Sequence, residues 1–217
     1  MSVTATTTSS TSYERFAGAC AFAAAGAGLA YSVVFVLVLR DVGGRAVETL
    51  TALFLLTGGL LSVGVILGLY GRLRTFDPGH ALLAAVLGAA GGLGAAIHGA
   101  FDLANAVNDP GRTLGLPNPV DPRGFLTFGL TGLAVLAVAR LVFMGAPLAR
   151  RVGVVGAVAG VLLIVVYLGR MIILDAKNPV VLGSAVLLGF LVSPAFYVLV
   201  GLDLRRPEVP APAARAR

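Results

Sequence analysis

Cysteine and histidine are almost absent from this sequence. Cys20 is the single cysteine among 217 residues, which excludes an intrachain disulfide, a CxxC redox pair and a thiolate metal cage. The two histidines, His80 and His98, are 18 positions apart on one expected helix, or about 27 Å at the helical rise per residue. A histidine-rich metal site inside a membrane is therefore excluded. We expect no metal, no cofactor and no catalytic residue set.

Charged residues are also scarce. They make up 12% of the chain, against 58% hydrophobic residues and a mean hydropathy of +0.95, whereas about a quarter of a soluble domain is charged. The apolar runs reach the roughly 20 residues that a helix needs to cross a bilayer. The net charge of +6 therefore indicates basic loops beside a membrane rather than a nucleic-acid partner. Residues 1–12 contain no basic residue, so we expect no cleavable signal peptide.

The hydropathy pattern predicts an all-α membrane protein. We expect a six-transmembrane-helix bundle of three helical hairpins over residues 13–206, between disordered tails at 1–12 and 207–217. The expected spans cover residues 16–39, 47–70, 79–103, 123–144, 152–174 and 180–202. Three of them begin after a capping residue followed by proline, a common helix start: Asp77-Pro78, Asp121-Pro122 and Asn178-Pro179. Pro194, inside the sixth span, predicts a kink.

The basic residues predict the orientation. If both termini are cytoplasmic, ten of the 16 Lys and Arg residues lie on the cytoplasmic side, as the positive-inside rule favours. Few lysines, many arginines and abundant Ala and Gly suggest a bacterial coding sequence, so we expect a multi-pass protein of the bacterial cytoplasmic (inner) membrane. The arginines expected to bind anionic lipid headgroups on that side are Arg72, Arg74, Arg150, Arg151, Arg205 and Arg206.

Small residues mark two predicted packing faces. Gly88 and Gly92 form a GxxxG pattern in the third span, and Gly156 and Gly160 repeat the spacing in the fifth. Such faces let membrane helices approach closely. We expect these faces to point inward, with homo-oligomerisation through glycine-rich faces as a further option.

The segment HGAFDLANAVNDP, residues 98–110, is unusually polar for this chain. His98, Asp102 and Asn105 share a helix face with the glycines of the third span. Tyr167 and Arg170 lie at the same expected depth on the glycine face of the fifth span. Since an unpaired charge in a span costs a few kcal/mol, we expect Asp102 to pair with Arg170. The loop of residues 108–124, rich in Pro, Gly and Asn, is the expected lid.

The expected ligand site consists of His98, Asp102, Asn105, Tyr167 and Arg170. We expect a non-enzymatic binder of a small molecule, lipid headgroup or proton, in an outward-facing polar pocket between spans three and five. Three alternatives remain open: a small transporter, a membrane-embedded lipid-modifying enzyme with His98 or Asp102 as general base, and a structural or assembly subunit. Asp102 and Arg170 are then either a ligand site or a clamp between helices.

The order of parts resembles that of uncharacterised bacterial six-span membrane proteins of the domain-of-unknown-function kind. The features are a second span ending in GLYGRLR, a Pro/Asn-rich outer loop and a last span ending in GLDLRR, within about residues 13–206. The resemblance implies the six-span fold and no particular activity.

Overall fold

The computed structural model describes residues 11–39, 44–108, 123–175 and 178–206. Within these ranges the chain is helical and contains no strand. Six helical stretches are long and apolar enough to cross a membrane. In chain order they are α1 (Ser12–Val33) with η1 (Val34–Leu39), α2 (Arg45–Leu73), α3 (Pro78–Asn108), η2 (Phe125–Leu130) with α4 (Thr131–Phe143), α5 (Arg150–Ile172), and α6 (Pro179–Leu187) with η3 (Leu188–Val192) and α7 (Ser193–Leu204). The segments η1, η2 and η3 are π-helical.

The six predicted spans correspond to these six helical stretches, but the first, second, third and sixth stretches are longer than expected. The first begins at Ser12 because Thr11 and Glu14 form a capping box: the Glu14 amide donates to Thr11 Oγ1 at 3.1 Å, and the Thr11 amide to Glu14 Oε2 at 2.8 Å. The third helix continues beyond Leu103 to Asn108. The polar segment around Asp102 is therefore part of the helix itself.

The two described proline-linked starts are capped as predicted. Asp77 Oδ1 accepts the His80 amide at 3.0 Å, and Asn178 Oδ1 accepts the Val180 amide at 3.0 Å. The hydrogen bond from the His80 amide, with the His80 ring 2.8 Å from the other carboxylate oxygen, lowers the pKa of the partly exposed Asp77. Asp121 and Pro122 lie outside the described residues.

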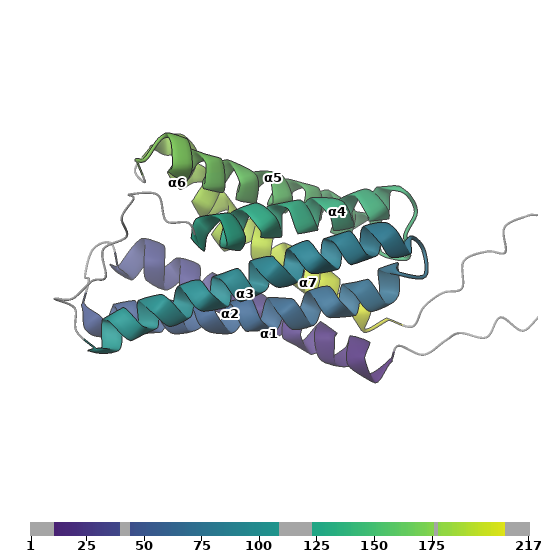
Figure 1. Ribbon diagram of the computed structural model, residues 1–217, viewed down its shortest axis with the longest axis horizontal. Helices are drawn as coiled ribbons and strands as arrows, with labels where there is room; N and C mark the ends of the chain where they lie inside the picture. Colours follow the sequence, from purple (N-terminus) through teal and green to yellow (C-terminus); the bar gives the residue numbers. More distant parts are fainter. Residues whose placement is uncertain (1–10, 40–43, 109–122, 176–177, 207–217) are drawn as a thin grey trace, which may run out of the picture.

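The helices pack in chain order into a ring, which Figure 1 shows from the side. α2 packs between α1 and α3, α3 packs on η2 and α4, and α4 packs on α5; the sixth span then packs on α5 and, through α7, returns to α1. The expected three hairpins are therefore consecutive parts of one ring rather than separate units. The ends of α1 and α7 that are nearest the chain termini lie together, since Arg205 contacts Gly18. We call this end of the bundle the terminal end, and the opposite one the far end.

The glycine faces pack inside this ring. Gly88 lies against Ile66 of α2, and Gly92 against Ser62 of the same helix, so closely that an added Cβ would come within 2.5 Å and 2.6 Å of their side-chain atoms. Gly156 and Gly160 of α5 face α7 and α4 rather than α3. The inward orientation is as predicted. These four glycines pack within the chain, and homo-oligomerisation through other glycine-rich faces stays a prediction.

Pro194 follows a break in the sixth span. α6 changes to the π-helical turn η3 just before it, and the regular helix resumes as α7. Proline lacks an amide hydrogen and its ring clashes with the carbonyl four residues earlier, so a widened turn at this point is the expected accommodation. The predicted kink therefore coincides with a break in regular α-helix.

The two ends of the bundle differ in packing. Leu69, Leu73, Leu141 and Leu204 are among the largest fully buried side chains, and all lie in the half toward the terminal end. In the far half the ring encloses a cavity. The difference in packing places the candidate site in the far half.

Candidate functional site

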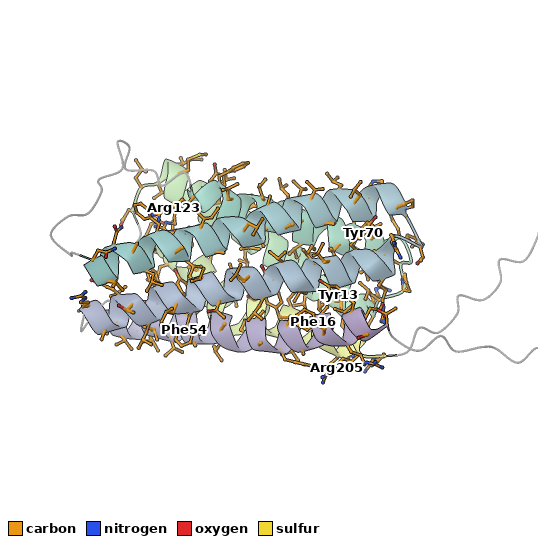
Figure 2. The ribbon with its side chains drawn as sticks, turned by 60° about the horizontal axis from the view of Figure 1, so that its bottom comes forward. Tyr13, Phe16, Phe54, Tyr70, Arg123 and Arg205 are labelled. Atoms are coloured by element: carbon orange, nitrogen blue, oxygen red, sulfur yellow. The ribbon has the colours of Figure 1, made fainter. Side chains whose placement is uncertain are left out.

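Asp102 is paired with Arg123, at the start of the fourth span. Asp102 Oδ1 lies 3.1 Å from Arg123 Nη1, and Asp102 Oδ2 lies 3.5 Å from His98 Nε2. The Arg123 guanidinium stacks on Phe101, 4.3 Å from the ring centroid, and is labelled at the far end of the bundle in Figure 2. The Arg123 side chain is 16% exposed and that of Asp102 43%. His98, Asp102 and Arg123 thus form a partly exposed network on α3.

The expected pair of Asp102 with Arg170 is not formed. In the ring, η2 and α4 lie between α3 and α5, so Arg123 reaches the carboxylate and Arg170 does not. Among the described residues, no carboxylate is within ion-pair distance of Arg170. Arg170 instead lines a cavity that also includes Tyr31 of the first span.

The other expected site residues lie around this region. Asn105 is half-buried, one turn beyond Asp102 on α3. Tyr167 packs on Phe125 of η2, with ring centroids 5.6 Å apart, and its hydroxyl lies 3.5 Å from Met171 Sδ. Of the five expected site residues, only Arg170 lines the cavity. Residues 109–122, which make up most of the expected lid, lie outside the described residues.

The cavity has a volume of about 290 Å³ and receives side chains from all six spans. Its walls are mainly apolar and aromatic. The aromatic residues that line it are Tyr31, Phe35, Phe54, Phe128, Phe196 and Tyr197. Arg170, in the last turn of α5, contributes the one charged side chain among the described lining residues. An apolar chamber with a guanidinium on its wall suits a molecule that is mostly apolar and carries an acidic group.

The hydroxyl groups around the cavity differ in their hydrogen bonding. Ser32 Oγ donates to the Gly28 carbonyl at 2.9 Å, and Ser62 Oγ to the Gly59 carbonyl at 2.7 Å. Thr127 is only 8% exposed, and its Oγ1 has no hydrogen-bond partner among the described residues. A buried hydroxyl without a partner costs about 1–3 kcal/mol. Thr127 therefore offers a polar contact that a ligand could complete.

All three π-helical turns border this cavity. Phe35 and Val36 come from η1, Thr127 and Phe128 from η2, and Leu188 and Gly189 from η3. π-Helical turns are rare and occur frequently at functional sites. Here they interrupt the spans at the depth of the cavity. No sequence feature used above, apart from Pro194, predicted them.

A second polar cluster, at the terminal end, was missed by the sequence analysis. Arg72 Nε lies 3.0 Å from Glu14 Oε1, and the side chain of Arg72 is 3% exposed. Its guanidinium also donates to the Asp203 carbonyl at 2.5 Å and to the Arg206 carbonyl at 3.1 Å. Arg72 is therefore not a headgroup ligand as expected, because burial in an ion pair keeps it from the membrane surface.

Asp203 extends this cluster to the fifth span. Its Oδ2 accepts the Ala149 amide at 2.6 Å at the start of α5, and its Oδ1 lies 3.6 Å from Arg206 Nη1 and 3.9 Å from Arg151 Nη2. The cluster so joins the ends of α1, α2, α5 and α7. Figure 2 shows Arg205, Tyr13 and Phe16 at the same end. Together with the leucines above, these contacts close the bundle there.

Within the described residues, no group of three or more His, Cys, Asp or Glu side chains could hold a metal ion. The described residues that line the cavity also include no His, Cys, Asp or Glu. The described part of the cavity wall therefore lacks the usual general acids and bases apart from its tyrosines.

The fold and site together define a class, a six-helix protein compatible with a multi-pass membrane location. No family model, no curated protein and no solved structure matches the chain. The resemblance to six-span bacterial proteins accordingly remains a prediction from the motifs alone.

Proposed function

We propose that the protein binds, within the membrane, an amphiphilic molecule with an apolar body and one anionic group. The observation that carries the proposal is Arg170 on the wall of a cavity whose other described lining residues are uncharged. A guanidinium recognises carboxylate and phosphate through paired hydrogen bonds. The aromatic and aliphatic walls favour the apolar body, since burying hydrocarbon contributes about 25 cal/mol per Å².

The ion pair of Asp102 with Arg123 supports this assignment. Arg123 already neutralises Asp102 at 3.1 Å, which leaves the charge of Arg170 for a ligand. A pair between Asp102 and Arg170 would have cancelled that charge instead. Of the five expected site residues, the proposal retains Arg170. It replaces the expected polar pocket between spans three and five by a chamber lined by all six spans.

We infer an orientation with both termini in the cytoplasm of a bacterial cell. Ten of the 16 basic residues then lie on the cytoplasmic side, and the cavity lies in the outer half of the membrane. The exposed arginines at the terminal end would contact anionic headgroups: Arg74, Arg150, Arg151, Arg205 and Arg206.

Two rival functions are less well supported. A transporter needs a path through the terminal end, where Leu69, Leu73 and Leu204 are fully buried beside the pair of Glu14 with Arg72. A lipid-modifying enzyme needs reacting groups at its substrate, and His98 and Asp102 are not on the cavity wall. A binding role requires neither a path nor a reacting group.

The test uses decyl phosphate, a single-chain anion, and decanol, its uncharged counterpart, with purified protein in a non-ionic detergent. A ligand that binds the folded protein raises the melting temperature by an amount that grows with the ratio of its concentration to Kd. Decyl phosphate is expected to stabilise the parent more than decanol does. Arg170→Gln should weaken its binding by roughly tenfold or more, because hydrogen bonds to charged groups contribute about 1.5–3 kcal/mol. Arg140→Gln, at an exposed arginine of α4 outside the cavity, is the matched control.

A second pair of variants tests the cavity itself. An added Cβ meets nothing within 4 Å at Gly28 or at Gly26, yet only Gly28 lines the cavity. Gly28→Phe should abolish the stabilisation, whereas Gly26→Phe should leave it unchanged. The proposal fails if decyl phosphate does not stabilise the parent, or if both phenylalanine variants respond as the parent does.

A further inference from the structure

The ring of helices is open on one side at the far end. η1 packs on α2, and α6 packs on α5 and η3, but η1 and α6 do not form a packed interface with each other. Figure 1 shows the end of the first span and α6 apart at that end. The first and sixth spans do meet nearer the terminal end, where Ser32 lies against Gly189. We call the opening between η1 and α6, beyond this contact, the lateral gap.

The residues beside the lateral gap border the cavity and the membrane at once. Phe35 and Val36 of η1 line the cavity, as do Leu182 and Ala185 of α6. Yet η1 contains no buried residue, and α6 contains only Val181. Since no described helix covers this side, the cavity adjoins the surface that hydrocarbon would cover in a bilayer.

The size of the cavity limits what it can enclose. Pockets that bury a whole drug-sized ligand have about 300–1,000 Å³, and this one has about 290 Å³. A membrane lipid is larger than that, so one chain would enter and the remainder would stay outside. The lateral gap provides the place for the remainder.

Arg170 and the deeper cavity residues lie in the same order as the headgroup and the acyl chain of a lipid in a leaflet. Arg170 lies in the last turn of α5, at the far end, where headgroups of the adjacent leaflet are found. Phe196 and Ser193, on the sixth span beyond η3, line the deeper part of the cavity. A lipid with its headgroup at Arg170 and a chain pointing to Phe196 keeps the orientation that it has in the bilayer.

We propose that the ligand is an anionic membrane lipid, one acyl chain of which enters the cavity sideways through the lateral gap while its phosphate binds Arg170. This inference rests on the proposed function and adds the source of the ligand and its route. The π-helical turn η1 forms one side of the gap, and η3 lies at its inner end, where Gly189 meets Ser32.

The first experiment maps the bound chain. Full-length protein is reconstituted in vesicles of phosphatidylcholine with phosphatidylglycerol whose acyl chain ends in a photoreactive diazirine. After illumination, labelled peptides are identified by mass spectrometry. Label is expected on cavity residues such as Phe196 and Tyr197, and Arg170→Gln should reduce it by roughly tenfold, whereas Arg140→Gln should not. Label confined to side chains that face the lipid outside the cavity, such as Leu191, overturns the inference.

The second experiment closes the gap. In a Cys20→Ala background, Val36→Cys and Leu182→Cys are joined by a bismaleimide that contains a cleavable disulfide, and joining is verified by intact mass. The joined protein should lose cavity labelling by the diazirine lipid and regain it after cleavage. Because the same variant is measured in both states, loss through misfolding would not be reversed by cleavage.

Decyl phosphate separates this inference from the proposed function. Decyl phosphate has one chain and no second chain that must stay outside the cavity, so we expect it not to require the lateral gap and to stabilise the joined protein as well as the cleaved one. Equal lipid labelling in both states refutes the lateral route and leaves the cavity site intact. If both the joined and the cleaved protein lack lipid labelling and decyl phosphate binding, the proposed function is refuted as well. Decyl phosphate binding without any lipid labelling of the parent assigns the site to a water-borne anion instead.

Discussion

Asp102 on α3 pairs with Arg123, 21 positions later in the chain, and not with Arg170 on α5. This pairing predicts a specific pattern of energetic coupling. Asp102→Ala and Arg123→Ala should each lower the melting temperature, and the double variant should lose little more than either single one, because paired residues are non-additive. The coupling should be about 1 kcal/mol or less, since Asp102 is well exposed.

The control cycle pairs Asp102→Ala with Arg170→Ala. These two effects should add, because the residues share no ion pair. Melting temperatures of all five variants and the parent, in one detergent without added ligand, decide the question. Strong coupling of Asp102 to Arg170 with none to Arg123 would contradict the network described above.

The second prediction concerns Arg72. It is buried, bonded to Glu14, and bonded to carbonyl groups at the end of α7. Arg72→Met should destabilise the protein by about 3–5 kcal/mol, because it leaves Glu14 as a buried charge without its arginine. Arg74→Met is the matched control, at an exposed arginine two positions away, and should change the melting temperature little.

The unfolding free energy of the three proteins is compared by denaturant titration in mixed micelles. Glu14→Gln together with Arg72→Met should recover part of the loss, since the buried charge is then removed. An Arg72→Met variant as stable as the parent would mean that the cluster does not hold the terminal end together.

The fold was accessible from the sequence because its signals are local. Each span is a continuous apolar run, and the carboxylate of Asp77 and the amide of Asn178 cap helices at the positions that their following prolines suggested. The glycines of α3 face inward, because a face of small residues allows close packing only where another helix lies against it. Each of these features depends on residues within a few turns.

The partners of the charges were not accessible in the same way. Shared depth and glycine-rich faces indicated Arg170 as the partner of Asp102, and Arg123 was not considered. The order of helices around the ring brings Arg123 to the carboxylate instead. Glu14 was overlooked because it precedes the first apolar residue of the expected span, so nothing connected it with Arg72. Both errors concern which helices are neighbours, which one sequence does not state.

The cavity was the least predictable feature, since an unfilled volume is a property of six helices together. One signal was nevertheless present. Glycines are dense among the lining residues and remove side-chain volume from the centre of the bundle: Gly28, Gly58, Gly59, Gly91, Gly92 and Gly189. The sequence analysis interpreted small residues only as contacts between helices, which is correct for Gly92 but not for Gly28, beside which there is open space.

Thr127 provides a prediction that separates stability from binding. Its buried hydroxyl has no hydrogen-bond partner among the described residues, so Thr127→Val removes a group that costs about 1–3 kcal/mol to bury unpaired, while it keeps the side-chain shape. Without ligand, the valine variant should therefore be at least as stable as the parent. A ligand that donates to or accepts from this hydroxyl should bind the variant about two- to tenfold more weakly, the equivalent of about 0.5–1.5 kcal/mol for one hydrogen bond.

The measurement is a pair of melting curves for each protein, with and without decyl phosphate at several concentrations. Thr131→Val, at a hydroxyl that also lines the cavity, is the control for a general loss of polarity. If Thr127→Val lowers the ligand-free melting temperature by several degrees, the hydroxyl is satisfied inside the protein and is not reserved for a ligand. If it stabilises the free protein and leaves the affinity for decyl phosphate unchanged, the ligand occupies the cavity without reaching η2. Only higher ligand-free stability combined with weaker binding fits a hydroxyl that the ligand completes.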